Sequence, residues 1–330
     1  MFWASYLLAA LAVVLAWPVP VLLSRAQWPA RSPFTAMILW QAVGLAGGLS
    51  MIGAMLVYGL EPLGDNLVAG LRGLAAMVLF NAPTTALGFW HLFALSAAAL
   101  LTAHLVFTLL LTYVKIRRQR RRHRELLELL ASPSPERAGT LVISHDSPVA
   151  YCLPGGARSI TVLSDGLMSA LEPAELRAVL SHENAHLSQR HHLLLWVFAA
   201  WRQALPWLPT TLLAQQAVNS LIEMLADDVA LKEVSRSTLI KAIAIVAAGP
   251  EGAPAMRPPA ALAGGAGGSL EFDTDSTTGS VSARTTASRV SRLLSSQPPL
   301  PQPATAAVLA LSALLLAVPT ALLVVPGLLG

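Results

Sequence analysis

Four stretches of the chain carry no formally charged residue, and each is long enough to cross a lipid bilayer. They cover residues 2–23, 35–60, 88–114 and 304–325. A helix needs about 20 apolar residues to span the roughly 30 Å hydrocarbon core of a bilayer. Only 12% of the residues are charged, whereas soluble domains average about 25%. The composition therefore predicts a mainly α integral membrane protein with four transmembrane helices.

Three details of the apolar segments add to this prediction. Residues 68–80 are apolar but interrupted by Arg72, so we expect a surface-lying or partly buried helix there and no fifth span. Residues 2–23 lack the basic start and the small-residue cleavage site of a signal peptide, so we expect them to be retained. Gly44 and Gly48 form a GxxxG step in the second stretch, which predicts close helix packing.

Basic residues near the spans predict the orientation of the chain. Seven of them follow the third stretch within ten positions, namely Lys115, Arg117, Arg118, Arg120, Arg121, Arg122 and Arg124. Without these seven charges the net charge of +4 would be −3, so the basicity is local. The positive-inside rule places this segment in the cytoplasm. We therefore predict a bacterial-type plasma membrane protein with both termini outside, and anionic lipid headgroups as partners of the basic run, with no direct nucleic acid.

The segment Ser181-His182-Glu183-Asn184-Ala185-His186 contains the HExxH pattern of zinc peptidases. Pro173 and the acidic residues just upstream predict the first turn of a helix that runs into the motif. Side chains four residues apart project from one face of a helix. His182 and His186 can therefore hold one Zn²⁺, and Glu183 can take a proton from a water held by the metal.

A catalytic zinc site generally has three protein ligands, so a third must come from elsewhere in the chain. Glu223 and Asp227 lie four residues apart on a second predicted helix and can face the same site. We expect Glu223 to bind the metal. Asp227 would accept the outer N–H of a ligand histidine and fix its tautomer.

His192 is an alternative third ligand, because it follows His182 by ten residues as in the longer HExxHxxGxxH pattern. That pattern uses a glycine to break the helix, and Gln189 occupies this position. In a continuing helix His192 would point roughly 240° around the axis from His186. We therefore favour Glu223 and expect His191 and His192 to be solvated or interfacial.

The sequence divides into a three-span region at 1–114, a soluble domain at 115–248, a linker at 249–303 and the fourth span at 304–330. The domain combines helices with short strands predicted at 140–143, 149–153 and 159–163, which we expect to form a small antiparallel sheet. A short apolar helix at 193–201 is expected to cover the site. Residues 249–303 are rich in Gly, Pro, Ser and Thr and predict a flexible linker, with a short helix at 289–294. The single cysteine, Cys152, fits a reducing cytoplasm.

Glu223 and Asp227 belong to the pattern ExxAD, which covers residues 223–227. The chain resembles the BlaR/MecR-type membrane metallopeptidases in its order of spans, basic junction, strands, HExxH helix and ExxAD helix. These proteins are related in their core to HtpX-like proteases. The resemblance implies a cytoplasmic gluzincin-like catalytic domain with one Zn²⁺ per chain. Carried over by position, it assigns the metal to His182, His186 and Glu223, the base to Glu183, and the supporting carboxylate to Asp227. Residues 151–155, with Tyr151, Pro154 and Gly155, look like the strand and turn against which substrate lies in that family.

Together these features predict a membrane-embedded zinc endopeptidase that cleaves a protein or peptide on the cytoplasmic side, in regulated proteolysis or signal transduction. A transcriptional repressor is one candidate substrate. The alternatives are an HtpX-like quality-control protease and a non-catalytic, zinc-containing transducer; the intact glutamate of HExxH argues against the second. Antibiotic-sensing members of the family carry a large extracellular sensor domain after the fourth span. Since this chain ends at Gly330, we expect any sensor to be a separate partner.

Overall fold

The computed structural model describes residues 2–80, 87–134, 139–154, 159–248, 277–295 and 297–324. The described chain is mostly helical, and four of its helical segments are long and apolar enough to cross a membrane. They are built on α1 (Phe2–Ala16) with α2 (Pro18–Arg25), α3 (Pro33–Leu60), α5 (Phe89–Leu130) and α12 (Gln302–Val324). These four segments agree with the spans predicted from composition.

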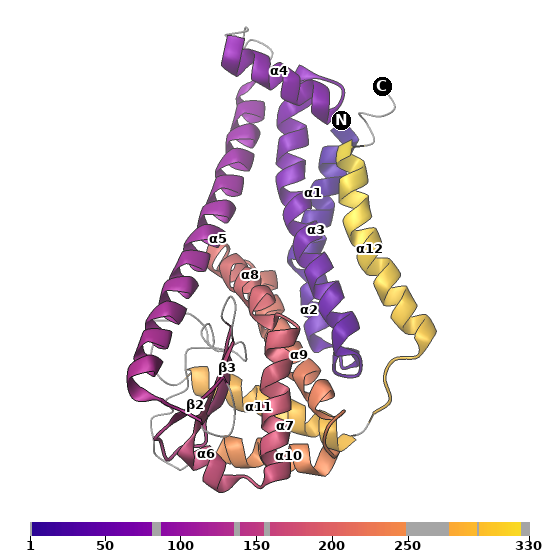
Figure 1. Cartoon of the computed structure of the whole chain (residues 1–330). Coiled ribbons are helices and arrows are strands. Elements are labelled where there is room, and N and C mark those ends of the chain that lie inside the picture. The colour runs from indigo at the N-terminus through magenta and orange to yellow at the C-terminus, as the bar shows by residue number, and fades with distance from the viewer. Residues whose placement is uncertain are drawn as a thin grey trace.

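The elements separate into a bundle of long helices and a compact domain at one end of it. The long helices α1, α3, α5 and α12 extend in the same general direction, and α4 (Leu67–Phe80) lies across the end opposite the domain (Figure 1). Helix α1 begins and α12 ends near α4 (Figure 1). Two short 3-10 helices, η1 (Trp28–Ala30) and η2 (Glu61–Leu63), complete the turns on either side of α3. Because α4 has only 14 residues, it is too short to span the hydrocarbon core.

Helix α5 joins the bundle to the domain without a break. Its 42 residues extend for roughly 63 Å at 1.5 Å per residue, about twice the thickness of the hydrocarbon core. The second half therefore carries the basic run beyond the apolar part of the helix. Two side-chain hydrogen bonds attach α5 to α8 (His191–Ala204): His104 Nε2 lies 3.0 Å from the Ala204 carbonyl, and Thr112 donates to Gln203 over 2.8 Å.

The sheet contains β1 (Ser132–Pro133), β2 (Thr140–Ile143), β3 (Ala150–Leu153) and β4 (Ile160–Ser164) in the order β1-β2-β4-β3. Strands β3 and β4 pair antiparallel, whereas β2 and β4 pair parallel with Leu141 opposite Val162. The prediction of an antiparallel sheet was wrong, because β4 inserts between β2 and β3. Since β2 and β3 run in opposite directions, a strand between them that is antiparallel to β3 is parallel to β2. Helix α6 (Asp165–Ala170) follows β4, and the Ser164 side chain accepts from its Leu167 N–H.

Four further helices build the rest of the domain: α7 (Pro173–Ser188), α9 (Pro209–Ala230), α10 (Arg236–Ala248) and α11 (Thr277–Ser295). Helix α9 packs directly on the bundle of long helices, since Ile222 shares a buried cluster with Trp40 of α3 and Phe198 of α8. Complete burial of such side chains contributes roughly 1.5–3 kcal/mol each. This contact fixes α9 relative to the spans.

Helix α11 lies within the segment for which the sequence predicted a flexible linker with a helix at 289–294 only. The structure describes a helix over residues 277–295, and residues 249–276 lie outside the described residues. Contacts with other elements hold its second half. Leu293 is buried in a cluster with Ala178 of α7 and Ile243 of α10, and Arg292 donates to both carboxylate oxygens of Asp228 at 2.7 and 3.0 Å. Tertiary packing therefore stabilises a helix whose composition alone predicts little order.

The GxxxG step of α3 does not act as a single packing surface. A Cβ atom on Gly44 would lie 2.8 Å from the ring of Trp201 in α8, whereas one on Gly48 would have nothing within 4 Å. Gly44 thus makes room for an indole ring from the domain.

Candidate metal centre

Helix α7 begins with a reciprocal capping box that explains its position in the sequence. Glu175 accepts from the Glu172 backbone N–H over 2.9 Å, and Pro173 occupies the first turn. Both features satisfy or remove N–H groups that would otherwise lack partners. Lys241 of α10 contacts the buried Glu175 carboxylate at 2.6 Å and ties α7 to its neighbour. The HExxH residues then fall on the second half of the helix.

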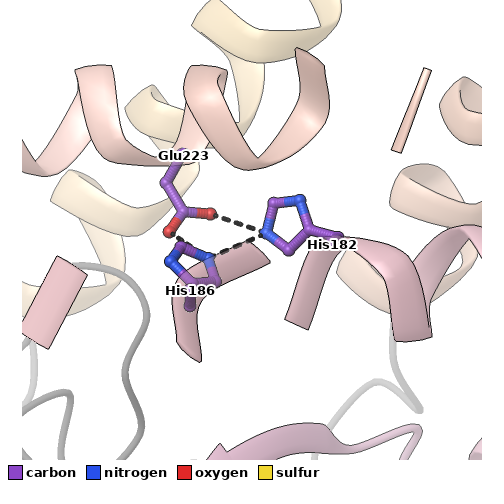
Figure 2. Close-up of side chains that lie close together, drawn as sticks. All are labelled: His182, His186 and Glu223. Atoms are coloured by element: carbon purple, nitrogen blue, oxygen red, sulfur yellow. Dashed lines mark hydrogen bonds and ion pairs between the residues drawn. The ribbon is translucent and has the colours of Figure 1, made fainter. Parts of the chain in front are cut away.

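Three side chains from α7 and α9 converge on one point. His182 Nε2 and His186 Nε2 lie 3.2 Å apart, and the two oxygens of Glu223 each lie 3.4 Å from one of these nitrogens (Figure 2). All three side chains are buried. One ligand atom from each lies within 4.8 Å of the others, a grouping suited to a single metal ion.

Asp227, one helical turn after Glu223, supports His182 from behind. Its Oδ1 lies 3.0 Å from His182 Nδ1, and its carboxylate is fully buried. Burial and the charge of Arg289 oppose protonation of His182, but the hydrogen bonds to Asp227 and Glu223 outweigh them and raise its pKa to about 9. Burial also opposes the charge on Asp227, yet its hydrogen bonds to His182 and Arg289 lower its pKa.

His186 is held by a residue for which the sequence predicted a different environment. His191 Nδ1 lies 3.0 Å from His186 Nδ1, and only 1% of His191 is exposed. The expectation that His191 is solvated or interfacial was therefore wrong. Helix α7 ends without a glycine because Arg190 adopts a left-handed conformation, with φ of 52°, and α8 starts at His191. His192 is not part of the converging group, and Glu223 is.

Arg289 of α11 reaches the same carboxylates and was not recognised from the sequence. Its Nε and Nη2 donate to the two oxygens of Asp227 at 2.8 and 2.6 Å, and its Nη1 donates to Glu223 over 3.1 Å. Burial opposes the charge of Arg289, but the two carboxylates raise its pKa. The sequence shows only that Arg289 and Arg292 are one helical turn apart. That both face acidic residues on α9, the second facing Asp228, is visible only in the structure.

Glu183 lies beside the converging group and against the sheet. Burial raises the pKa of Glu183 to about 7, although the nearby His182 charge and a hydrogen bond from the Cys152 backbone act in the opposite direction. A carboxyl group with such a pKa can both accept and release a proton near neutral pH. Cys152 belongs to β3, so the acid–base candidate and the edge strand are adjacent.

The residues predicted to lie along the substrate are attached to α5. The Tyr151 hydroxyl lies 2.8 Å from His123 Nε2, and the Pro154 carbonyl accepts from Arg124 over 3.4 Å. Strand β3 is an edge strand of the sheet. Gly155 lies outside the described residues.

The chemistry of the converging atoms fits a metal ion. Asp227 and His191 engage the Nδ1 atoms of the two motif histidines, so their Nε2 atoms point toward each other and toward Glu223. Glu223 Oε1 is buried and has no hydrogen-bond donor. Two imidazole nitrogens and a carboxylate oxygen are the ligand set of several catalytic zinc sites. Among the described residues, no other group of three such side chains converges in this way.

Comparison with known proteins finds a family match over part of the chain. The family model of Peptidase family M48 matches residues 116–257, which contain α7 and α9 and therefore the three converging side chains. The match supports a metallopeptidase of family M48 over this segment. Arg289 falls beyond the matched residues. Searches among curated proteins and among solved structures found no match.

Proposed function

We propose that this chain is a membrane-embedded zinc endopeptidase. The observation that carries the proposal is the convergence of His182, His186 and Glu223 within 4.8 Å, with Glu183 beside them, inside the segment that matches family M48. A non-catalytic transducer would need the metal ligands but not a half-buried glutamate beside them with a pKa of about 7.

His182, His186 and Glu223 would hold one Zn²⁺, which when bound would polarise the scissile carbonyl and acidify the attacking water. The orientation of these ligands comes from the protein itself. Asp227 and His191 contact the outer nitrogens of the two histidines, and Arg289 fixes the Glu223 and Asp227 carboxylates. Ligands that are already oriented need little rearrangement to act.

Glu183 is the proposed acid–base residue. Its half-buried carboxylate accepts a proton from the attacking water and returns it to the amine of the leaving peptide. The hydrogen bond from the Cys152 backbone holds this carboxylate at the edge of β3. A substrate bound along that edge would therefore lie next to the proton acceptor.

An extended polypeptide is the substrate class that best fits the edge of β3. One edge of this strand pairs antiparallel with β4. Its other edge pairs with no described strand, since β3 is last in the order β1-β2-β4-β3. An added strand would bind through backbone hydrogen bonds, which any sequence can form, while side-chain pockets would select among sequences. Tyr151, Pro154 and Gly155 are the proposed contacts.

We place the catalytic domain in the cytoplasm, with both termini outside. The basic residues of α5 follow its apolar half on the domain side, which the positive-inside rule assigns to the cytoplasm. The starts and ends of the spans fit this proposal, since α1 begins and α12 ends near α4, away from the domain (Figure 1). The proposed role is regulated proteolysis of the kind associated with BlaR/MecR-type proteins, with a repressor as one candidate substrate.

The test is zinc content and proteolysis of the detergent-purified wild type and the Glu183→Gln variant, with unfolded protein as substrate. Glu233→Gln, which makes the same change at an exposed position, is the matched control. We expect zinc in all three proteins and cleavage by the wild type and Glu233→Gln only. Undiminished cleavage by Glu183→Gln would refute the assigned role, and zinc retained by His182→Ala would refute the assigned ligand.

A further inference from the structure

His191 links one predicted metal ligand to the surface through a series of two hydrogen bonds, and its own side chain is buried. His186 Nδ1 lies 3.0 Å from His191 Nδ1, and His191 Nε2 lies 2.9 Å from Gln189 Oε1. His186 and His191 are each 1% exposed, so water does not compete for the contact between them, whereas Gln189 lies at the surface. These hydrogen bonds lead away from the converging group, since the other ring nitrogen of His186, Nε2, faces His182 and Glu223 (Figure 2).

Only one arrangement of protons along these hydrogen bonds is compatible with a metal ion bound to His186. His186 must keep the Nε2 lone pair free to bind a metal, so its proton must lie on Nδ1. Only one proton fits between two nitrogens 3.0 Å apart, so His191 Nδ1 must accept it. The proton of His191 then lies on Nε2 and is donated to the Gln189 carbonyl oxygen, which can only accept.

The backbone explains how His191 reaches this position. In an uninterrupted helix His191 would lie five residues after His186, roughly 500° and therefore roughly 140° away around the axis. The left-handed conformation of Arg190 ends α7 and starts α8 in a new direction. Left-handed backbone is disfavoured for a residue with a Cβ atom, so the turn is maintained by the packing around it.

We infer that His191 is a positioning residue that fixes the tautomer and ring orientation of His186, so that its Nε2 lone pair points at the metal. This inference rests on the proposed metal centre. The two motif histidines would then be supported in different ways: His182 donates to a carboxylate, Asp227, and His186 donates to a neutral imidazole. Supporting groups of this kind typically change metal affinity by about 10- to 100-fold when they are removed.

The test compares two replacements of His191 in the full-length, detergent-purified protein. His191→Asn keeps an acceptor oxygen close to the place of Nδ1, whereas His191→Phe fills the space without an acceptor. The dissociation constant for Zn²⁺ is measured by competition with a chromogenic chelator, and the site geometry by the visible absorption of the Co²⁺-loaded protein. We expect Zn²⁺ binding by His191→Phe to weaken about 10- to 100-fold, with an altered Co²⁺ spectrum, and His191→Asn to stay within a few-fold of wild type.

A role in packing alone predicts the opposite order, because phenylalanine replaces the ring volume and asparagine does not. Equal affinities for the wild type and His191→Phe, or equal losses in both variants, would overturn the inference. A wild type that bound no Zn²⁺ would instead overturn the proposed function. These outcomes are distinguishable because the readout is metal affinity and does not depend on cleavage.

A second pair of variants leaves every histidine in place. Arg190→Gly should retain Zn²⁺ affinity, because glycine readily adopts the φ of 52° found here. Arg190→Val should weaken Zn²⁺ binding, because a β-branched residue disfavours that conformation and would displace His191. Unchanged affinity in Arg190→Val, with α7 and α8 intact by circular dichroism, would contradict the proposed dependence on this turn.

Discussion

Arg289→Met provides the sharpest test of how the site is built, because it removes the only guanidinium described in contact with Asp227. In the wild type, Asp227 accepts two hydrogen bonds from Arg289, at 2.6 and 2.8 Å, and is fully buried. Methionine retains much of the apolar stem but leaves the carboxylate with His182 as its remaining charged partner. Removing one member of a buried ion pair costs about 3–5 kcal/mol, because the other charge stays buried without compensation.

The metal-free protein should show this loss most clearly, since a metal ion would take over the neutralisation of Glu223. Domains of 150–250 residues change their melting temperature by about 2–4 °C per kcal/mol, so we expect a decrease of roughly 6–20 °C. Thermal unfolding in detergent after chelation measures it. Arg284→Met is the matched control, since Arg284 is an exposed arginine on the same helix. Equal melting temperatures for the two variants would refute the argument that Arg289 compensates the buried carboxylates.

Three further predictions concern the metal and the packing around it. The pKa of His182 in the metal-free protein is about 9, so at pH 8 this residue is protonated and zinc binding should release about one proton. Calorimetry in buffers of different ionisation enthalpy measures the number of protons released. Identical heats in all buffers would contradict the prediction. Asp227→Asn should weaken zinc binding about 10- to 100-fold in chelator competition, whereas Asp228→Asn, which contacts Arg292, should not. Gly44→Ala should destabilise the protein by about 1–3 kcal/mol, because its Cβ would meet an indole ring, whereas Gly48→Ala should have no adverse effect on thermal unfolding.

Several features of this protein follow from short-range patterns in its sequence. Long uncharged stretches predict the four candidate spans, because the length of a spanning helix depends only on the thickness of the hydrocarbon core. The pairs His182 and His186, and Glu223 and Asp227, are four residues apart, and helical geometry alone places each pair on one face. Local composition also predicted strands at 140–143, 149–153 and 159–163, and the structure has strands at 140–143, 150–153 and 160–164.

Other features depend on contacts between distant segments. The pairing of β2 with β4 is decided by the path of the chain around β3, which alternation of side chains does not report. The composition of residues 277–288 predicted a linker, because it gives little indication of a helix. Helix α11 is stabilised instead by contacts of Leu293 and Arg292 with α7, α9 and α10. Arg289 could not be assigned to the site without knowing that α11 crosses α9.

His191 marks the boundary between what the sequence determined and what the tertiary structure decided. The HExxH spacing determined that His182 and His186 share one face, since that depends on a single helix. Whether the helix continued past Ser188 depended on one backbone conformation, that of Arg190. Without glycine at this point the local preference favours a continuing helix, and only the packing of α8 between α5 and α9 selects the turn. The sequence therefore predicted the three converging side chains and Asp227, whereas only the tertiary structure brought His191 and Arg289 to them.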